Sequence, residues 1–376
     1  MKYKEIGVMS KKETLHSQIQ KYIISQIETG EKKPGDKLPT EFELAQMFNT
    51  SRTTVLRALD QLMAHGVIYK KRGSGSYVSD KQNQQNGSRI ISLILPFFKN
   101  SNFSEDTNEN LLIRGCQVYL ARHGYMLTIS YASEDFDEEF KAINQCKDNA
   151  SIGVILYPSS SINTLADFYS IILDDFPIVF IDNPLICPEC NYVLSDNKSG
   201  GVIATNHLFE KGCDNFTFAC DATLAHYSLQ DRYFGFCKSL KLHDYIINKA
   251  NCFVDCALKS KQNNAASGDY YIELLKKIMS QPAKKYGIFC TSDILAYEFL
   301  EAAKSLQINV PNKLAIVGYG SSAQQLNYQL TTIKQDFYSI GENAARELLK
   351  IIDAPKGTKT SGAKYIPVEL SQGKTT

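Results

Sequence analysis

The chain has 376 residues, of which 43% are hydrophobic, with 41 Lys and Arg against 40 Asp and Glu. This length exceeds one typical domain, and the composition is ordinary for a globular protein with a sizeable core. The longest apolar runs, such as Ile90–Phe98, have the length of a strand and not of a membrane span. Residues 1–14 are charged and lack the apolar segment of a signal peptide. We therefore expect a cytoplasmic protein with no membrane partner.

The charge is divided unevenly along the chain. Residues 1–80 carry 13 Lys and Arg against 9 Asp and Glu, whereas the remainder is mildly acidic. Ser79–Ser88 is entirely polar and cannot bury enough apolar surface to fold alone. The sequence therefore predicts a basic head at 1–78, a linker at 79–88 and a body at 89–376.

Ten cysteines are scattered through apolar segments. The only close pair with metal-like spacing is Cys187 and Cys190, and no further CxxC or HxxxH motif completes a set of zinc ligands. Reduced thiols are the better interpretation for a cytoplasmic protein, and we expect no metal or cofactor.

Three helices and a hairpin are predicted in the head. The first helix, Leu15–Thr29, carries apolar residues on one face and ends at Gly30. The second begins at Thr40, where Glu43 completes a capping box. The third begins at Ser51 after a short turn, an arrangement typical of a helix-turn-helix. Strands at 66–70 and 75–78 then form a hairpin, which makes the head an α+β winged helix-turn-helix.

Side chains suited to DNA lie at two places in the head. The start of the third helix presents small hydroxyls and one guanidinium, which can pair with guanine in the major groove, and its amide groups favour a phosphate. The turn of the hairpin is basic and contains glycines that allow close approach. The residues concerned are Ser51, Arg52, Thr53 and Thr54 on the helix, and Lys71, Arg72 and Gly73 in the wing. A structural helical domain with solvated charges is the alternative interpretation of these residues.

The head resembles the GntR family of winged-helix regulators. The resemblance rests on Pro34–Glu41, Glu43–Ala45, Ser51–Val55, Gly66–Ile68 and the Gly73-x-Gly75-x-x-Val78 motif. It implies a dimer that binds a palindromic operator in double-stranded DNA. The family contacts it implies fall on Thr40, Glu41, Ser51, Arg52, Thr54 and Gly73.

One position departs from the family pattern. Family members commonly carry Arg directly after the Val of this motif, where this chain has Leu56 followed by Arg57. Neighbouring residues point about 100° apart around a helix, so Arg57 is a candidate DNA contact in a different direction. This departure bears on the operator sequence.

The body alternates short apolar strands with amphipathic helices, which predicts an α/β fold with parallel sheets in two lobes. The strands are predicted at 89–96, 126–130, 152–156, 178–181, 215–219, 287–290 and 315–318. The helices are predicted at 109–123, 137–147, 162–173, 198–211, 230–240, 294–305 and 340–352. Ligands of such sheets bind beyond the carboxyl ends of the strands, so the loops that follow the strands should carry the function.

Residues able to bind a sugar follow several of these strands. Sugar recognition needs polar forks for adjacent hydroxyls and flat aromatic rings for C–H faces, and Arg can donate to two oxygens at once. The candidates from chemistry and position are Phe97, Phe98, Asn102 or Phe103, Asp182, Asn183, Arg232 and Asp293. Alternatively, the two phenylalanines are core, Asp293 caps the helix from Ile294, and Arg232 forms a surface ion pair.

The body resembles LacI-type regulators, which share the fold of periplasmic sugar-binding proteins. The resemblance rests on Phe180–Asn183, Arg232 with Gly235-Phe236, Phe289–Ala296, Leu314–Tyr319 and Leu330–Asp336. It implies ligand contacts at Arg232, Asp293, Asp182, Asn183 and Gln335, and an approximate alignment adds Phe253 and Gln324. The family often has Asp where this chain has Gly320, which leaves the sugar unspecified. A GntR head on such a body is similar to the arabinose-repressor subgroup.

The two resemblances together imply a DNA-binding transcriptional regulator, most simply a repressor of carbohydrate-utilisation genes, that acts as a homodimer. Its effector would be a monosaccharide such as L-arabinose or L-fucose. A nucleoside or purine ligand is an alternative that the fold also accommodates. An enzyme with a DNA-binding head is the third interpretation, but no GxSxG motif occurs and the six histidines share no catalytic motif.

Overall fold

The computed structural model describes most of the chain and divides it into two units. The described residues are 15–64, 67–71, 74–79, 89–96, 107–132, 136–158, 176–182, 190–224, 226–246, 251–262, 267–320, 329–355 and 361–376. One unit comprises 1–90 with 148–152, and the other 91–147 with 153–376. We call residues 15–79 the head and residues 89–376 the body, and describe each by itself. The predicted helix at 162–173 and all of the predicted linker at 79–88 except Ser79 lie outside the described residues.

The head contains three helices around one small core. These are α1 (Leu15–Glu28), α2 (Glu41–Met47) and α3 (Arg52–Ala64). Thr40 is the N-cap of α2, and its capping box with Glu43 is present as the sequence predicts. Apolar residues from all three helices and from the wing meet in a core of Ile19, Ile23, Leu38, Leu44, Val55, Ala58, Leu59, Leu62, Ile68 and Val78. The amphipathic spacing read from the sequence therefore marks the buried face of each helix.

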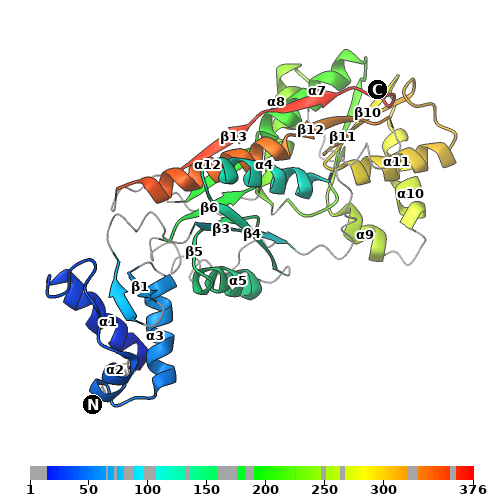
Figure 1. Ribbon diagram of the computed structural model, residues 1–376. Helices are drawn as coiled ribbons and strands as arrows, with labels where there is room; N and C mark the ends of the chain where they lie inside the picture. The colour runs from blue at the N-terminus through cyan, green and yellow to red at the C-terminus, as the bar shows by residue number, and fades with distance from the viewer. Residues whose placement is uncertain are drawn as a thin grey trace, which may run out of the picture. The chain divides into compact units, whose positions relative to one another are not determined.

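The wing is an antiparallel pair, β1 (Ile68–Lys71) and β2 (Gly75–Val78), in which Ile68 lies opposite Val78. The segment before α2 adds to its edge, because Leu38 N donates to Ser76 O at 2.9 Å and Val78 N donates to Asp36 O at 2.9 Å. These bonds attach the wing to the chain that leads into α2. The helices and the wing are thus one packed unit (Figure 1).

The first lobe of the body is built on a sheet in the order β13-β7-β6-β5-β3-β4. Its strands are β3 (Ile90–Pro96), β4 (Met126–Ala132), β5 (Ser151–Leu156), β6 (Ile178–Ile181), β7 (Asn191–Ser195) and β13 (Gly362–Ile366). Its helices are α4 (Asn108–Arg122), α5 (Phe136–Asp148) and α12 (Phe337–Asp353). The β5–β6, β6–β7 and β7–β13 pairs are parallel, as the alternation of strands and helices predicts.

The second lobe has a sheet in the order β14-β12-β11-β10-β8-β9. Its strands are β8 (Asn215–Ala219), β9 (Cys252–Phe253), β10 (Tyr286–Cys290), β11 (Leu314–Tyr319), β12 (Thr331–Gln335) and β14 (Val368–Ser371). Its helices are α7 (Asn197–Glu210), α8 (Tyr227–Leu242), α9 (Cys256–Gln262), α10 (Ser267–Met279) and α11 (Asp293–Ser305). Only β14 is antiparallel to its neighbour among the pairs described. The predicted fold class, an α+β head with an α/β two-lobed body, is confirmed.

The chain crosses between the lobes at three places, after β7, after β12 and after β13. Asp196 and Asp336 stand at the first two crossings and cap α7 and α12 with their side chains. Asp196 N donates to Ile366 O at 2.9 Å, so the first and third crossings lie side by side. Motion of one lobe against the other would therefore be concentrated in a few residues.

Each lobe contains one very close helix crossing. α4 packs on α12, where a Cβ at Gly115 would collide with the carbonyl oxygen of Tyr338 (Figure 1). α7 packs on α8, where a Cβ at Gly235 would collide with the carbonyl oxygen of Lys198. The second crossing fixes α8, which carries Arg232, against the start of α7. Among the described residues, no helix combines the length and apolar character needed to span a membrane.

Candidate nucleic-acid interface and effector site

The start of α3 is ordered by hydroxyl groups. Thr54 N donates to Ser51 Oγ at 3.3 Å, and the Ser51 hydroxyl lies 2.7 Å from Thr53 Oγ1 and 2.9 Å from Thr54 Oγ1. Ser51, Arg52 and Thr53 are exposed, because Val55 and the following apolar residues turn the opposite face of α3 into the core. The predicted recognition residues therefore form one accessible, polar helix start.

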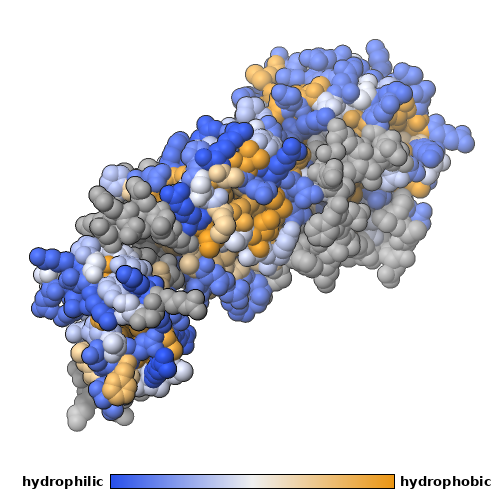
Figure 2. Space-filling view, in the orientation of Figure 1, coloured by the Kyte–Doolittle hydropathy of each residue, from blue (hydrophilic) through white to orange (hydrophobic). Residues whose placement is uncertain are grey.

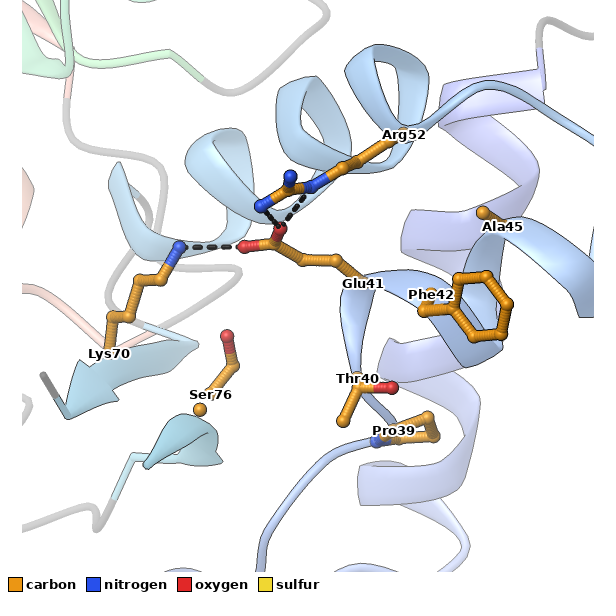
Figure 3. Close-up of a pocket in the computed structure, with 9 residues that line it drawn as sticks. Pro39, Thr40, Glu41, Phe42, Ala45, Arg52, Lys70 and Ser76 are labelled. Carbon is orange, nitrogen blue, oxygen red and sulfur yellow. Dashed lines mark hydrogen bonds and ion pairs between the residues drawn. The ribbon is translucent and has the colours of Figure 1, made fainter. Parts of the chain in front are cut away.

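Glu41 joins three elements of the head through its carboxylate. Arg52 Nε donates to Glu41 Oε2 at 2.8 Å, and a terminal nitrogen of the same guanidinium lies 2.8 Å from that oxygen. Lys70 Nζ, on β1, donates to Glu41 Oε1 at 2.7 Å. Hydrogen bonds from Lys70 and then Arg52 hold the pKa of Glu41 below its usual value. Figure 3 shows this carboxylate between the two cations.

A groove of about 380 Å³ lies beside this cluster, between α2, α3 and the wing. Its lining residues are Pro39, Thr40, Glu41, Phe42, Ala45, Arg52, Lys70, Gly75 and Ser76. Phe42 is an unusual member, since 69% of its surface is exposed although it is a large apolar residue. The groove combines cations, a hydroxyl and an exposed ring, which suits contact with a nucleic-acid strand.

The described residues include most of the predicted DNA contacts. Thr40 caps α2, Lys71 is exposed at the end of β1, and Arg57 is exposed on α3 while Leu56 beside it is half-buried. Arg72 and Gly73 lie outside the described residues. Sequence reasoning missed Lys70, although the alternation of a strand predicts that two successive lysines point to opposite faces of the wing.

A first polar cluster in the body gathers at the carboxyl ends of first-lobe strands. Tyr157, which follows β5, donates to Asp182 Oδ2 at 2.7 Å. Gln335 Nε2, at the end of β12, donates to Ser195 Oγ at 2.8 Å and lies 3.4 Å from Asp182 Oδ1. Burial and the neighbouring Asp182 carboxylate raise the pKa of Tyr157 well above its usual value. Of the predicted ligand contacts, Asp182 and Gln335 are thus brought together.

A second cluster surrounds Arg232 on α8, a residue that is only 8% exposed. Arg232 Nε donates to Asn197 Oδ1 at 2.9 Å and a terminal nitrogen donates to Thr291 O at 2.6 Å. Its guanidinium carbon lies 3.7 Å from the centre of the Tyr319 ring. None of the ion pairs among the described residues involves this buried cation. Arg232 is therefore held by neutral acceptors and by a ring face.

The two clusters share one electrostatic environment. Burial raises the pKa of Tyr319, and Arg232 acts against that rise while Asp182 adds to it. The hydroxyl of Tyr319 is buried and has no hydrogen-bond partner among the described residues. Tyr157, Asn197 and Tyr319 were missed by sequence reasoning, although Tyr157 and Tyr319 directly follow the predicted strands at 152–156 and 315–318. The arrangement offers donors and acceptors from both lobes.

Two other predicted ligand contacts are placed differently. Asp293 is 1% exposed and accepts a short hydrogen bond from Thr332 on β12. Ser292, and not Asp293, is the N-cap of α11. Phe253 is half-buried in β9, with Lys277 Nζ 5.6 Å from its ring centre. The remaining predicted contacts, Phe97, Phe98, Asn102, Asn183 and Gln324, lie outside the described residues.

The cysteines of the described residues are free thiols, most of them buried. Burial raises the pKa of several, for example that of Cys213 to about 11, so they are poor nucleophiles and metal ligands. Within the ranges described, no group of three or more His, Cys, Asp or Glu residues could hold a metal ion. Cys187 lies outside those ranges.

Comparison with known proteins matches both parts of the chain. A family model described as bacterial regulatory proteins, gntR family, matches residues 15–78, and one described as periplasmic binding protein-like domain matches residues 205–376. The chain is 26% identical over 362 residues to the arabinose metabolism transcriptional repressor of Geobacillus stearothermophilus, covering 93% of this chain and 94% of that protein.

Solved structures match about three quarters of the chain. The transcription regulator CcpA of Lactococcus lactis is 17% identical, with a TM-score of 0.61 and coverage of 77% of this chain and 99% of that one. A periplasmic binding protein/LacI transcriptional regulator of Alkaliphilus metalliredigens, complexed with D-xylulofuranose, is 22% identical with a TM-score of 0.58 and covers 77% of this chain and 99% of that one.

Proposed function

We propose that this chain, in which a GntR-type DNA-binding domain precedes a periplasmic-binding-protein-like domain, is a sugar-responsive transcriptional repressor. The observation that carries the proposal is the similarity over 93% of the chain to a repressor of arabinose metabolism. Operator DNA and a monosaccharide would be its two ligands, and its site of action is the cytoplasm. Binding, and not catalysis, is the role assigned to the polar clusters of the body.

The head is proposed to bind double-stranded operator DNA through the start of α3 and the wing. Arg52 has 74% of its side chain exposed and is the base-reading residue, because a guanidinium pairs bidentately with guanine. The hydroxyls of Ser51, Thr53 and Thr54 would contact phosphates, and Lys71 would contact the backbone beside the wing. Thr40, Glu41, Arg57, Arg72 and Gly73 complete the proposed DNA-binding set.

The body is proposed to bind a monosaccharide, with L-arabinose or L-fucose as the first candidates. The buried guanidinium of Arg232 already donates to two neutral oxygen atoms, and its remaining N–H groups can donate to the hydroxyl oxygens of a sugar. Asp182 and Gln335 from the other cluster, with Asp293, Asn183, Asn102 and the aromatic residues Phe97, Phe98 and Phe253, are the further proposed contacts, together with Gln324. Closure of the lobes on the sugar would shift a population of conformers, by as much as the sugar's affinities for the two states differ.

A homodimer is proposed as the active form, since two heads are needed for a palindromic operator. β4 is the last strand of its sheet, and Met126, Ile129 and Tyr131 on it are 63%, 41% and 44% exposed. Figure 2 shows apolar residues gathered over the region of the body where α4 and β4 lie in Figure 1. An apolar edge strand favours association with a second copy. Sedimentation should show a dimer, and Met126→Glu should weaken it.

The test of the proposed function uses the full-length protein and a duplex that it enriches from a random-sequence pool. Binding to that duplex should weaken when one of about twenty monosaccharides is added. No enrichment would overturn the DNA-binding assignment, and no response to any monosaccharide would overturn the effector assignment. A response to nucleosides or purines alone would favour that alternative class of ligand.

A further inference from the structure

The carboxylate of Glu41 is the centre of a three-residue cluster made from three different elements. Both of its oxygens are engaged, one by Lys70 on β1 and the other by Arg52 on α3. The Glu41 side chain is 18% exposed, whereas that of Lys70 is 48% exposed and that of Arg52 is 74% exposed. The acidic member is thus the sheltered one and the arginine is the member that faces solvent.

The hydrogen-bond pattern leaves one edge of the Arg52 guanidinium directed away from Glu41. Nε and one terminal nitrogen bond to the same oxygen of Glu41, so the edge formed by the two terminal nitrogens stays accessible. That edge can donate two parallel hydrogen bonds, the geometry that pairs with O6 and N7 of guanine. Glu41 therefore restricts the rotamers of Arg52 without blocking the edge that would read a base.

Lys70 is the member that fixes Glu41 from the opposite side. Its ammonium group lies 2.7 Å from Glu41 Oε1, so its charge is paired with that carboxylate although 48% of its side chain is exposed. Lys71 follows on the same strand, and successive side chains of a strand point to opposite faces. The two neighbouring lysines are therefore expected to have different roles.

We propose that Glu41 and Lys70 are positioning residues that hold Arg52 for base recognition, and that this arrangement sets specificity at one base pair of the operator. The inference rests on the proposed DNA-binding function. Without the cluster, Arg52 would have to lose its rotamer freedom upon binding.

The experiment compares the duplex enriched by the wild-type protein with each of its single-base-pair variants. Arg52→Ala first identifies the base pair at which Arg52 discriminates. At that pair, Lys70→Met should reduce the ratio of the affinities for the enriched duplex and its variant by roughly 2- to 10-fold. This factor corresponds to the cost of ordering one long side chain at an interface. The slope of log affinity against log salt concentration should stay unchanged, because Lys70 releases no counterion. Lys70→Arg, which keeps the ion pair with Glu41, should retain the discrimination.

Lys71→Met is the matched control on the next residue of β1. It should reduce the salt slope by about one and weaken every duplex alike, as expected for a phosphate contact. In an Arg52→Ala background, Lys70→Met should leave the discrimination unchanged, since its effect passes through Arg52. Thermal unfolding of each variant shows whether the head remains folded.

Two results would overturn the positioning role of Lys70 and leave the proposed DNA-binding function intact. One is a Lys70→Met protein that binds all duplexes more weakly with a reduced salt slope, which would make Lys70 a phosphate contact. The other is an equal effect of Lys70→Met with and without Arg52. A wild-type protein that enriches no sequence would instead overturn the proposed function on which the inference rests.

Discussion

The head and the body each present one arginine at the centre of their candidate site, and the two differ in what surrounds them. Arg52 is 74% exposed and pairs with a carboxylate, Glu41. Arg232 is 8% exposed and donates to an amide oxygen and a backbone carbonyl oxygen. An exposed ion pair contributes about 0–1 kcal/mol to stability, whereas truncating a buried, hydrogen-bonded charge is strongly destabilising. The head arginine can therefore serve recognition at little structural cost, but the body arginine is also part of the fold.

The largest expected effect is that of Arg232→Met on the body. The substitution would leave Asn197 Oδ1 and Thr291 O without their donors, and a buried acceptor that loses its partner costs roughly 1–3 kcal/mol. We expect the free energy of unfolding to fall by about 3 kcal/mol, together with loss of the sugar response. Urea unfolding measures the first and duplex binding with added sugar measures the second. Lys238→Met, on the exposed side of α8, is the control and should change stability little. An unchanged unfolding midpoint in Arg232→Met would contradict a structural role.

Arg52→Ala should show the reverse pattern. Loss of one bidentate base contact should weaken binding to the enriched duplex by about 1–3 kcal/mol, while stability changes by less than about 0.5 kcal/mol. Fluorescence anisotropy with the enriched and a scrambled duplex gives the binding loss, and urea unfolding gives the stability. A large loss of stability would remove the contrast between the two arginines.

The sequence predicted the head well because its signals are local. The capping box needs only Thr40 and Glu43, and the start of α3 needs only Ser51 and the residues that follow it. The contact between Glu41 and Lys70 spans 29 positions and depends on how the wing packs on α2. No spacing rule within a helix or strand reports such a contact.

The body shows the same limit more strongly. Alternating apolar runs predicted most of its strands and helices, but Asp182 and Gln335 meet across 153 positions at a crossing between the lobes. β7, β9, β12, β13 and β14 were not predicted. β9, β13 and β14 are edge strands, and β7 and β12 each lie beside one of them, so the pairing of all five depends on distant parts of the chain. Asp293 was correctly placed after β10, yet its side chain bonds to Thr332, a choice that the sequence does not reveal.

A smaller effect is expected on the stability of the head when the N-cap of α2 is removed. Thr40→Ala removes the N-cap of α2 and its bond with the Glu43 amide group, which should cost about 1 kcal/mol. Thr40→Ser keeps the hydroxyl and should cost much less. Hydrogen exchange at the amide groups of α2 measures the local loss, and equal protection in both variants would contradict the capping role.

The smallest predicted effect concerns pH and tests whether the Arg52 cluster is electrostatic. The pKa of Glu41 is lowered by its bonds to Lys70 and Arg52, so the stabilisation is fully present above the ordinary glutamate pKa of about 4.3. It is lost as pH falls through the lowered value, because protonation removes the carboxylate charge. For a pair this exposed, we expect the change in stability to be only roughly 0.2–1 kcal/mol. The Nε–Hε NMR signal of Arg52 should therefore hold its position from neutral pH down to about 4.3 and move only below it. In Glu41→Gln the movement should disappear, whereas a wild-type signal that moves at or above the ordinary glutamate pKa would show that the guanidinium is not held by Glu41.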